Sequence, residues 1–339
     1  MKEKLLVVVT LILFAAILMP AAAQKKSQPK PLKNNAQDKA EKSVTEKASP
    51  KKSESRRRES PKRDLGQLWF ETQGRLDGKD SLYYIKGSAY TYIQGERPQK
   101  LFDVEGYNIR RLIPTPEKDG YFVATREVVF YEDPKTGEIL NQWRNPLTNE
   151  TNEVFHINND PVNFRYRIKD NKYIAVSVDG KREFGEQSPP EKWNGYYVWH
   201  ADVFPFYALP ELEKKYTAGE MFDFYASQDE VNKTSPPKVM ISWTRVSPWL
   251  PWMKMDKQPG AMLIHARSVR YESWEMLPEN VKNAVRTKFP LYQSAPFTVD
   301  PDKPNATSWT VYYDEMKDAP ALSPKPEINK LNFALNFYD

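Results

Sequence analysis

The sequence predicts a mainly β protein, organised as a large antiparallel β-barrel or a barrel-like sandwich with one or two helices. Beyond Leu65, short runs of β-branched and aromatic residues recur, and Pro, Gly, Asn and Asp residues typical of turns separate them. Strands do not alternate with long helices, which argues against a parallel doubly wound sheet. A sheet of this length must also protect its edges, and this favours a barrel.

The strand-like runs lie at nine places in the chain. They are residues 81–94, 121–131, 138–144, 163–169, 172–179, 194–206, 237–247, 261–271 and 308–314. Two similar turns, Asp133–Glu138 and Asn145–Glu150, each place a Pro second and a Gly or Asn fifth. Such turns join antiparallel strands, so we expect consecutive hairpins across 121–157.

Two stretches have helical character. Residues 278–288 begin with a Pro, place Val281 and Val285 four residues apart, and are followed by Pro290. Residues 210–231 carry acidic residues in the first turn and several large apolar side chains on one side. We therefore expect helices at both places.

The N-terminal residues resemble an export signal. Residues 1–23 combine two early lysines with an apolar run and three consecutive alanines, which is the pattern of a secretory signal peptide. The apolar run is too short to cross a bilayer comfortably, so we expect no transmembrane segment once the signal is cleaved. The alternative is an uncleaved anchor. Export predicts a periplasmic or secreted protein.

The positive charge of the chain is concentrated near its start. Residues 24–64 are rich in Lys, Ser and Pro and contain 14 Lys/Arg against 6 Asp/Glu, which predicts a disordered basic linker. The net charge of residues 24–64 is therefore +8, and that of residues 1–23 is +1. Because the whole chain carries +5, residues 65–339, which are expected to form a single β-rich domain, carry −4. This argues against nucleic acid as a partner. The linker can contact anionic envelope surfaces through non-specific charge. The alternative, which we favour, is a plain solvated spacer.

Composition and motifs exclude several chemistries. The 339 residues contain no Cys, so disulfides, thiolate zinc sites and cysteine nucleophiles are impossible. The chain has no phosphate-binding glycine loop, no G-x-S-x-G elbow and no dinucleotide fingerprint. The residues therefore identify no cofactor.

Histidines offer one candidate site. His156, His200 and His265 all lie in strand-like, aromatic-rich segments, and alternation places His200 and Asp202 on what is expected to be the interior face. Asp160 follows His156 by four residues. Imidazole with carboxylate can ligate a metal or orient a general base. The alternative is that each histidine is an ordinary core or rim residue.

Two further features suggest a pocket. Trp249 and Trp252 lie between prolines, which can present bulky side chains at the rim of a ligand pocket or can simply plug one end of a barrel. Arg126 interrupts an apolar strand. If its side chain points inward, it must pair with a carboxylate or bind an anionic ligand group. If it points outward, it is an ordinary surface arginine.

Several motifs resemble the bacterial family known as domain of unknown function 1838. The resemblance covers roughly residues 68–314, and it implies a bacterial, often exported protein without established activity or mapped catalytic residues. The matching motifs, in order, are Arg126–Tyr131, Asp133–Glu138, Trp143, Asn145–Pro146, His156, Asn159–Val162, Ser247–Trp249, Pro251–Met253, Gly260, His265 and Trp309.

Three functions remain open from the sequence. The first hypothesis is an exported β-barrel-type protein that binds a small apolar or planar molecule in an aromatic-lined pocket. The second is an enzyme, with or without a metal held by His156, His200 and His265. The third is a cell-envelope carbohydrate binder that uses exposed tryptophans and the basic linker. Whether the protein is an enzyme is left undecided.

Overall fold

A single large antiparallel sheet organises the chain. The computed structural model describes residues 63–303, except 171, 205, 210–213 and 256, together with 305–308 and 312. The predicted signal peptide, nearly all of the predicted linker and most of the predicted strand 308–314 lie outside the described residues. None of the helices in the described part is both long and apolar enough to cross a membrane.

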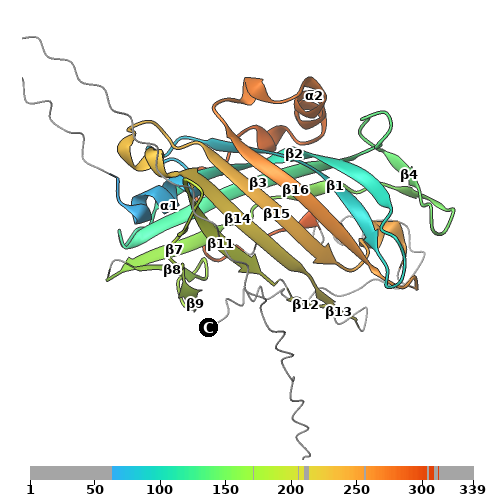
Figure 1. Cartoon of the computed structure of the whole chain (residues 1–339), viewed down its shortest axis with the longest axis horizontal. Helices are drawn as coiled ribbons and strands as arrows, with labels where there is room; N and C mark the ends of the chain where they lie inside the picture. The colour runs from blue at the N-terminus through green and yellow to red at the C-terminus, as the bar shows by residue number, and fades with distance from the viewer. Residues whose placement is uncertain are drawn as a thin grey trace, which may run out of the picture. The chain divides into compact units, whose positions relative to one another are not determined.

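The strands follow one another with few helices between them (Figure 1). The elements are α1 (Leu65–Gln73), β1 (Ser81–Tyr92), β2 (Lys100–Pro114), β3 (Gly120–Glu132), β4 (Gln142–Arg144), β5 (Thr151–Glu153), β6 (Ile157–Asn159), β7 (Phe164–Lys169), β8 (Lys172–Val176), β9 (Glu183–Glu186), β10 (Glu191–Trp193), β11 (Tyr196–Val203), β12 (Phe206–Leu209), β13 (Lys214–Thr217), β14 (Gly219–Ser227), η2 (Gln228–Asn232), β15 (Val239–Ser247), η3 (Pro251–Met253), β16 (Ala261–Tyr271), η4 (Trp274–Met276), α2 (Glu279–Lys288) and η5 (Pro290–Gln293).

Twelve strands form the main sheet in the order β10-β11-β14-β15-β16-β1-β2-β3-β7-β8-β9, with β6 paired to β3. Every pairing is antiparallel, which confirms the predicted class. The sheet does not close into a barrel, because β9 and β10 are its two unpaired edges. The preferred barrel is therefore not found, and the arrangement is sandwich-like.

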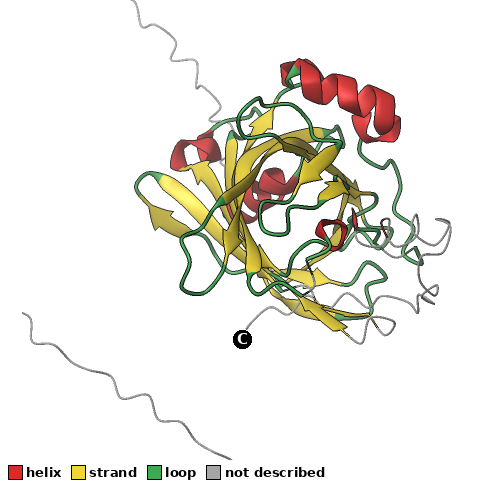
Figure 2. Cartoon of the chain, turned by 90° about the vertical axis from the view of Figure 1, so that its right-hand side faces the viewer, coloured by secondary structure: helices red, strands yellow, loops and turns green. Residues whose placement is uncertain are grey.

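The sheet curls until its two halves face each other (Figure 2). The ring of Trp69 in α1 shows this directly, because it contacts Tyr166 of β7 as well as Trp199 of β11 and Phe224 of β14. These strands lie toward opposite ends of the sheet order. Helix α1 thus fills one end of the space that the curled sheet encloses.

Close backbone approach helps β2 lie against its neighbour. Gly106 faces the interior, and a Cβ added there would lie 2.1 Å from the carbonyl oxygen of Val128 in β3. No side chain can occupy that space without a backbone shift. The glycine therefore permits the packing of β2 on β3 at the centre of the sheet.

The outward face of β1–β3 is covered by α2. Val281 and Val285 of this helix are fully buried and pack on Leu82, Ile109 and Phe130 of the sheet. The predicted helix 278–288 is confirmed in type and nearly in its bounds, with Pro278 as its N-cap residue. Figure 1 shows the helix lying on the outside of the sheet.

The predicted helix over 210–231 is wrong. Residues Gly219–Ser227 form β14, which pairs with β11 on one side and β15 on the other. Phe224 and Ala226, two residues apart, are buried, whereas Met221, which lies at an outward position between the cavity-lining Glu220 and Phe222, is exposed. Period-two alternation was thus present, but the apolar residues on both faces also matched a helical pattern.

Several elements were missed, including one long strand and one helix. Strand β2 carries Asp103, Glu105, Arg110 and Arg111, charges that obscured its alternation. Helix α1 begins after Asp64, whose carboxylate accepts a hydrogen bond from the amide of Gln67 at 2.6 Å. An Asp at the N-cap position is a helix-start signal.

Candidate functional site

A cavity of about 740 Å³ lies inside the curled sheet. Helix α1 bounds it at one end, where Trp69 clusters with Tyr83 of β1. The segment around η3 packs near the other end, where Trp252 clusters with Ala89, farther along the same strand. Alternate residues of β1 face inward between these two ends. The volume is in the range of small-molecule sites, roughly 300–1,000 Å³.

Apolar and aromatic side chains form most of the cavity wall. The indole of Trp243 in β15 stacks on the ring of Phe222 in β14, with ring centroids 6.2 Å apart and planes 6° apart. Other apolar lining residues come from both halves of the sheet and include Tyr83, Ile85, Tyr131, Ile157, Val162, Phe164, Val176, Ile241 and Ile264. Such a wall suits an apolar or planar molecule.

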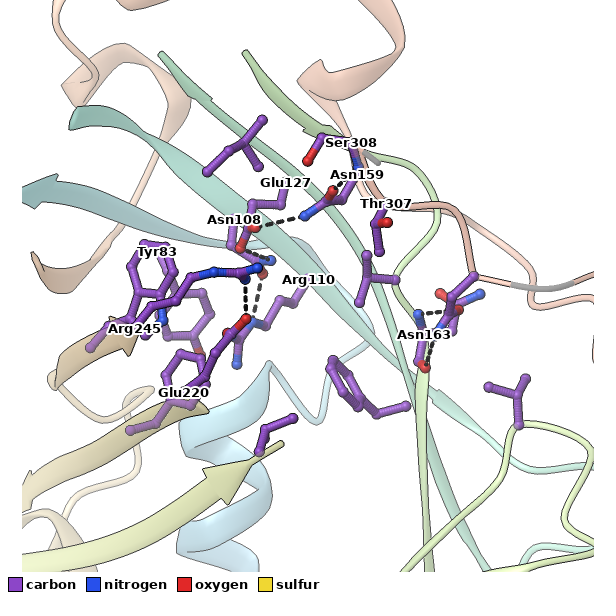
Figure 3. Close-up of a pocket in the computed structure, with 18 of the residues that line it drawn as sticks. Tyr83, Asn108, Arg110, Glu127, Asn159, Asn163, Glu220, Arg245, Thr307 and Ser308 are labelled. Carbon is purple, nitrogen blue, oxygen red and sulfur yellow. Dashed lines mark hydrogen bonds and ion pairs between the residues drawn. The ribbon is translucent and has the colours of Figure 1, made fainter. Parts of the chain in front are cut away.

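A polar network crosses the wall at β2, β3 and β6 (Figure 3). The side-chain amide of Asn108 accepts a hydrogen bond from Arg110 Nε at 2.6 Å and donates one to Glu127 Oε2 at 3.2 Å. Asn159 Nδ2 donates to the other oxygen of Glu127 at 2.9 Å. Asn108 therefore bridges the guanidinium and the carboxylate, which do not contact each other directly.

Burial shapes the chemistry of this network. The low-polarity surroundings, and then the negative charge of Glu220, raise the pKa of Glu127. Glu220 itself forms an ion pair with Arg245 across β14 and β15 (Figure 3). Arg110 Nη1 donates to the side-chain oxygen of Gln73 at 3.1 Å, and its guanidinium lies over the ring of Tyr83 at 4.6 Å.

Two buried polar atoms on the cavity wall lack a hydrogen-bond partner in the described part of the chain. They are Trp243 Nε1 and Ser268 Oγ, and both residues are more than nine-tenths buried. Buried polar groups are normally satisfied, and leaving one unpaired costs about 1–3 kcal/mol. Neighbouring atoms cover both of these polar atoms almost completely.

The cavity opens to solvent beside the turn between β8 and β9 and beside residues 301–303. Lys181, Arg182 and Lys303 are exposed there and line it together with Asp179. Lys181 pairs with Asp179 at 3.2 Å. Asp302 lies next to Lys303 and Glu183 next to Arg182, so charges of both signs surround the mouth.

None of the eight site residues singled out from the sequence lines this cavity. His156 is buried and its Nδ1 accepts a hydrogen bond from the amide of Tyr131 at 3.2 Å. Burial, assisted by the positive charge of Lys288, lowers the pKa of His156 to about 4. The residue is a neutral core histidine at neutral pH, as the alternative interpretation held.

His200 and Asp202 are exposed on the outward face, so their predicted inward orientation is wrong. The prediction assigned the alternation along β11 in the wrong phase. Val198 lies on the same outward face as His200 but is buried, so this face resembled a core face in the sequence. His200 Nδ1 lies 2.7 Å from Asp223 Oδ1 on β14. Burial by itself would lower the pKa of His200, but the hydrogen bond with Asp223 and the negative charge of that carboxylate raise this pKa above its ordinary value.

His265 is also exposed, and its Nδ1 lies 3.2 Å from Thr244 Oγ1. The three histidines therefore do not converge. Across the residues that the structure describes, no group of three or more His, Asp or Glu side chains is placed to hold a metal ion. The predicted ligands His156, His200 and His265 do not form a common site in this fold.

The structure does bring Arg126 and Asp160 together. Arg126 Nε lies 2.8 Å from Asp160 Oδ1, and Arg126 Nη1 donates to the carbonyl oxygens of Leu291 and Ser294 at 3.1 and 2.9 Å. Arg126 alternates with the inward-facing Glu127, so it lies on the outer face of β3. The pair attaches the η5 segment to the sheet.

The tryptophans between prolines are core residues. Trp249 and Trp252 are 7% and 4% exposed. The ring of Trp252 contacts Phe102, Tyr131 and Trp143 at centroid distances of 5.4–5.8 Å. The segment packs into the protein with its own aromatic rings, so its interpretation as an exposed rim is not supported. Its neighbour Leu250 lines the cavity.

Sequence reasoning missed the polar network itself. Asn108 and Arg110 lie in β2, which was not predicted, and Glu127 directly follows the Arg126 that attracted attention. Period-two spacing of Asn108 with Arg110 was the available signal. It could be used only once the segment was known to be a strand.

Comparison with known families adds one match. The model of the family described as "Protein of unknown function (DUF1838)" matches residues 78–316, which include almost all of the sheet. No curated protein matches the sequence.

Proposed function

The chain belongs to this DUF1838 family of unknown function, and we propose from its geometry that the protein binds a small, largely apolar or planar molecule in the cavity of the curled sheet. One observation carries the proposal. A cavity of about 740 Å³ lies inside the curled sheet, and apolar and aromatic side chains such as Tyr83, Phe222 and Trp243 line it. A bound molecule would supply the missing apolar contacts.

A matched pair of variants tests where the molecule binds. Ile157 is partly buried and lines the cavity, whereas Ile168 is 40% exposed and does not. We expect the neutral dye N-phenyl-1-naphthylamine to bind the full-length protein with a Kd of about 10 μM or below. Ile157→Trp should fill part of the cavity and weaken binding about tenfold or more. Ile168→Trp should leave it unchanged.

Two results would contradict the binding proposal, provided that the variants are folded. Circular dichroism checks that each variant is folded, and Val162→Trp replaces Ile157→Trp if the latter is not. Absence of dye binding to the wild-type protein contradicts the proposal. So does equal binding by wild type and a folded cavity variant. Mass spectrometry of an organic-solvent extract of the purified protein then identifies any molecule that co-purifies.

We also propose that the protein is exported to the periplasm or beyond. The support is the composition of residues 1–23, with a basic start, an apolar run and three alanines before Gln24. N-terminal sequencing of the mature protein from fractionated cells tests it. An intact Met1 in the cytoplasmic fraction would contradict export.

The other two hypotheses find less support. The enzyme hypothesis relied on histidines that the fold places apart. The carbohydrate hypothesis relied on exposed tryptophans, and among the described residues only Trp193 is markedly exposed, at 56%. Binding of a small molecule is therefore the function that the described part of the chain favours.

A further inference from the structure

We propose that the molecule bound in the cavity is an amphipathic carboxylic acid, whose carboxylate is held by Arg110 and whose apolar body lies against the aromatic wall. The inference rests on the proposed function and adds the chemical class of the ligand. It follows from how hydrogen-bond donors and acceptors are distributed on the wall.

The inference rests on Arg110, which has no direct ion-pair partner among the described residues, although the charge of Glu127 acts on it across Asn108. Its Nε and Nη1 donate to the neutral oxygens of Asn108 and Gln73, at 2.6 and 3.1 Å. No carboxylate forms an ion pair with it among the described residues, and Nη2 has no hydrogen bond there. A guanidinium removed from water is stabilised best by a planar carboxylate, which it can bind through two parallel hydrogen bonds.

The carboxylates of the wall are better satisfied than Arg110. Glu220 is paired with Arg245. Both oxygens of Glu127 accept amide hydrogen bonds, at 3.2 and 2.9 Å. The cavity thus lacks an unengaged acid that would select a cation.

Three probes with the same ring system test the charge of the ligand. They are 2-naphthoate, the neutral 2-naphthamide and the cationic 2-naphthylmethylamine, measured by displacement of N-phenyl-1-naphthylamine at pH 7. We expect 2-naphthoate to bind at least about tenfold more tightly than 2-naphthamide, because a hydrogen bond to a charged group contributes about 1.5–3 kcal/mol. Decanoate and decanamide form a second pair, in case the natural body is a chain.

Two substitutions test the role of Arg110. Arg110→Gln removes the charge, and Gln73→Glu places a carboxylate beside the guanidinium without removing it. Each should reduce the preference for acid over amide to about threefold or less, with little effect on amide binding. Gln73→Glu keeps the test valid if Arg110→Gln does not fold. Arg286→Gln on α2, outside the cavity, is the control and should keep the preference.

The outcomes separate the two proposals. If the neutral dye binds and Ile157→Trp blocks it, but neither acid exceeds its amide, the carboxylate inference is wrong and cavity binding stands. Preferential binding of 2-naphthylmethylamine also overturns the inference. If no probe binds the wild-type protein, cavity binding itself fails.

Discussion

Two buried glutamates beneath α2 should make the stability of this protein depend on pH. Glu105 and Glu132 are each 3% exposed, on β2 and β3, and Asn280 Nδ2 donates to both, at 3.4 and 3.2 Å. Burial, and then the hydrogen bond and charge of Glu105, raise the pKa of Glu132 to about 8. Burial by itself would raise the pKa of Glu105, but hydrogen bonds from Tyr84 and other neighbouring side chains keep this pKa below its usual range.

The direction of the effect follows from linkage. The pKa of Glu132 is higher in the folded than in the unfolded chain, where it is near 4.5, so the folded state binds more protons between these two pH values. Its contribution to stability is therefore largest below pH 4.5, falls as pH rises toward 8, and is constant above. One proton limits the slope to about 1.4 kcal/mol per pH unit.

Glu132→Gln tests this reasoning. Glutamine cannot ionise, yet it can donate to Glu105 as the protonated acid does. Urea unfolding, followed by tryptophan fluorescence at pH 5–9, gives the free energy of unfolding of both proteins. We expect the variant to gain about 2–4 kcal/mol relative to wild type between pH 5 and 8. Other titrating groups cancel in this comparison.

An exposed glutamate provides the control. Glu153→Gln, on β5, should differ from wild type by a constant amount at every pH. If the difference between wild type and Glu132→Gln is equally constant, the buried pair does not share a proton and the reasoning is refuted.

Three further predictions concern packing and the buried histidine. Gly106→Ala should lower the free energy of unfolding by about 1–3 kcal/mol in urea, because its Cβ would lie 2.1 Å from the Val128 carbonyl oxygen; unchanged stability would contradict the close approach. Trp252→Ala should cost about 3–5 kcal/mol and lower Tm, whereas Trp193→Ala at an exposed position should change Tm little; equal effects would refute the assignment of Trp252 to the core. His156 should titrate near pH 4 in NMR spectra, and a value near 6.5 would show that it is accessible to water.

Local patterns were sufficient for much of the architecture. The hairpin turns at 133–138 and 145–150 were recognisable because Pro, Gly and Asn have intrinsic backbone preferences, and both turns form, with Gly137 N donating to Asp133 O at 2.8 Å. Helix α2 was recognisable for the same reason, from a Pro at its start and valines four residues apart. These signals act over a few residues and need no tertiary partner.

The candidate site was much less predictable. Its polar members are ordinary when viewed one at a time, and only the pairing of β1, β2 and β3 places Tyr83, Asn108 and Glu127 in one row across the sheet. The conspicuous residues had simpler explanations. His156 is a core residue, and Arg126 with Asp160 attaches η5 to the sheet.

The amino-acid sequence alone determined the antiparallel β class, the positions of the main turns, the charge contrast between the first 64 residues and the body, and the family. These properties depend on composition and short-range preference. Tertiary structure alone decided that the sheet curls without closing, that α1 fills one end of it, and that Arg110 lies inside without a carboxylate partner among the described residues. Such properties depend on pairings between residues far apart in the chain, and a one-residue change in the phase of alternation would turn every side chain of a strand to the opposite face.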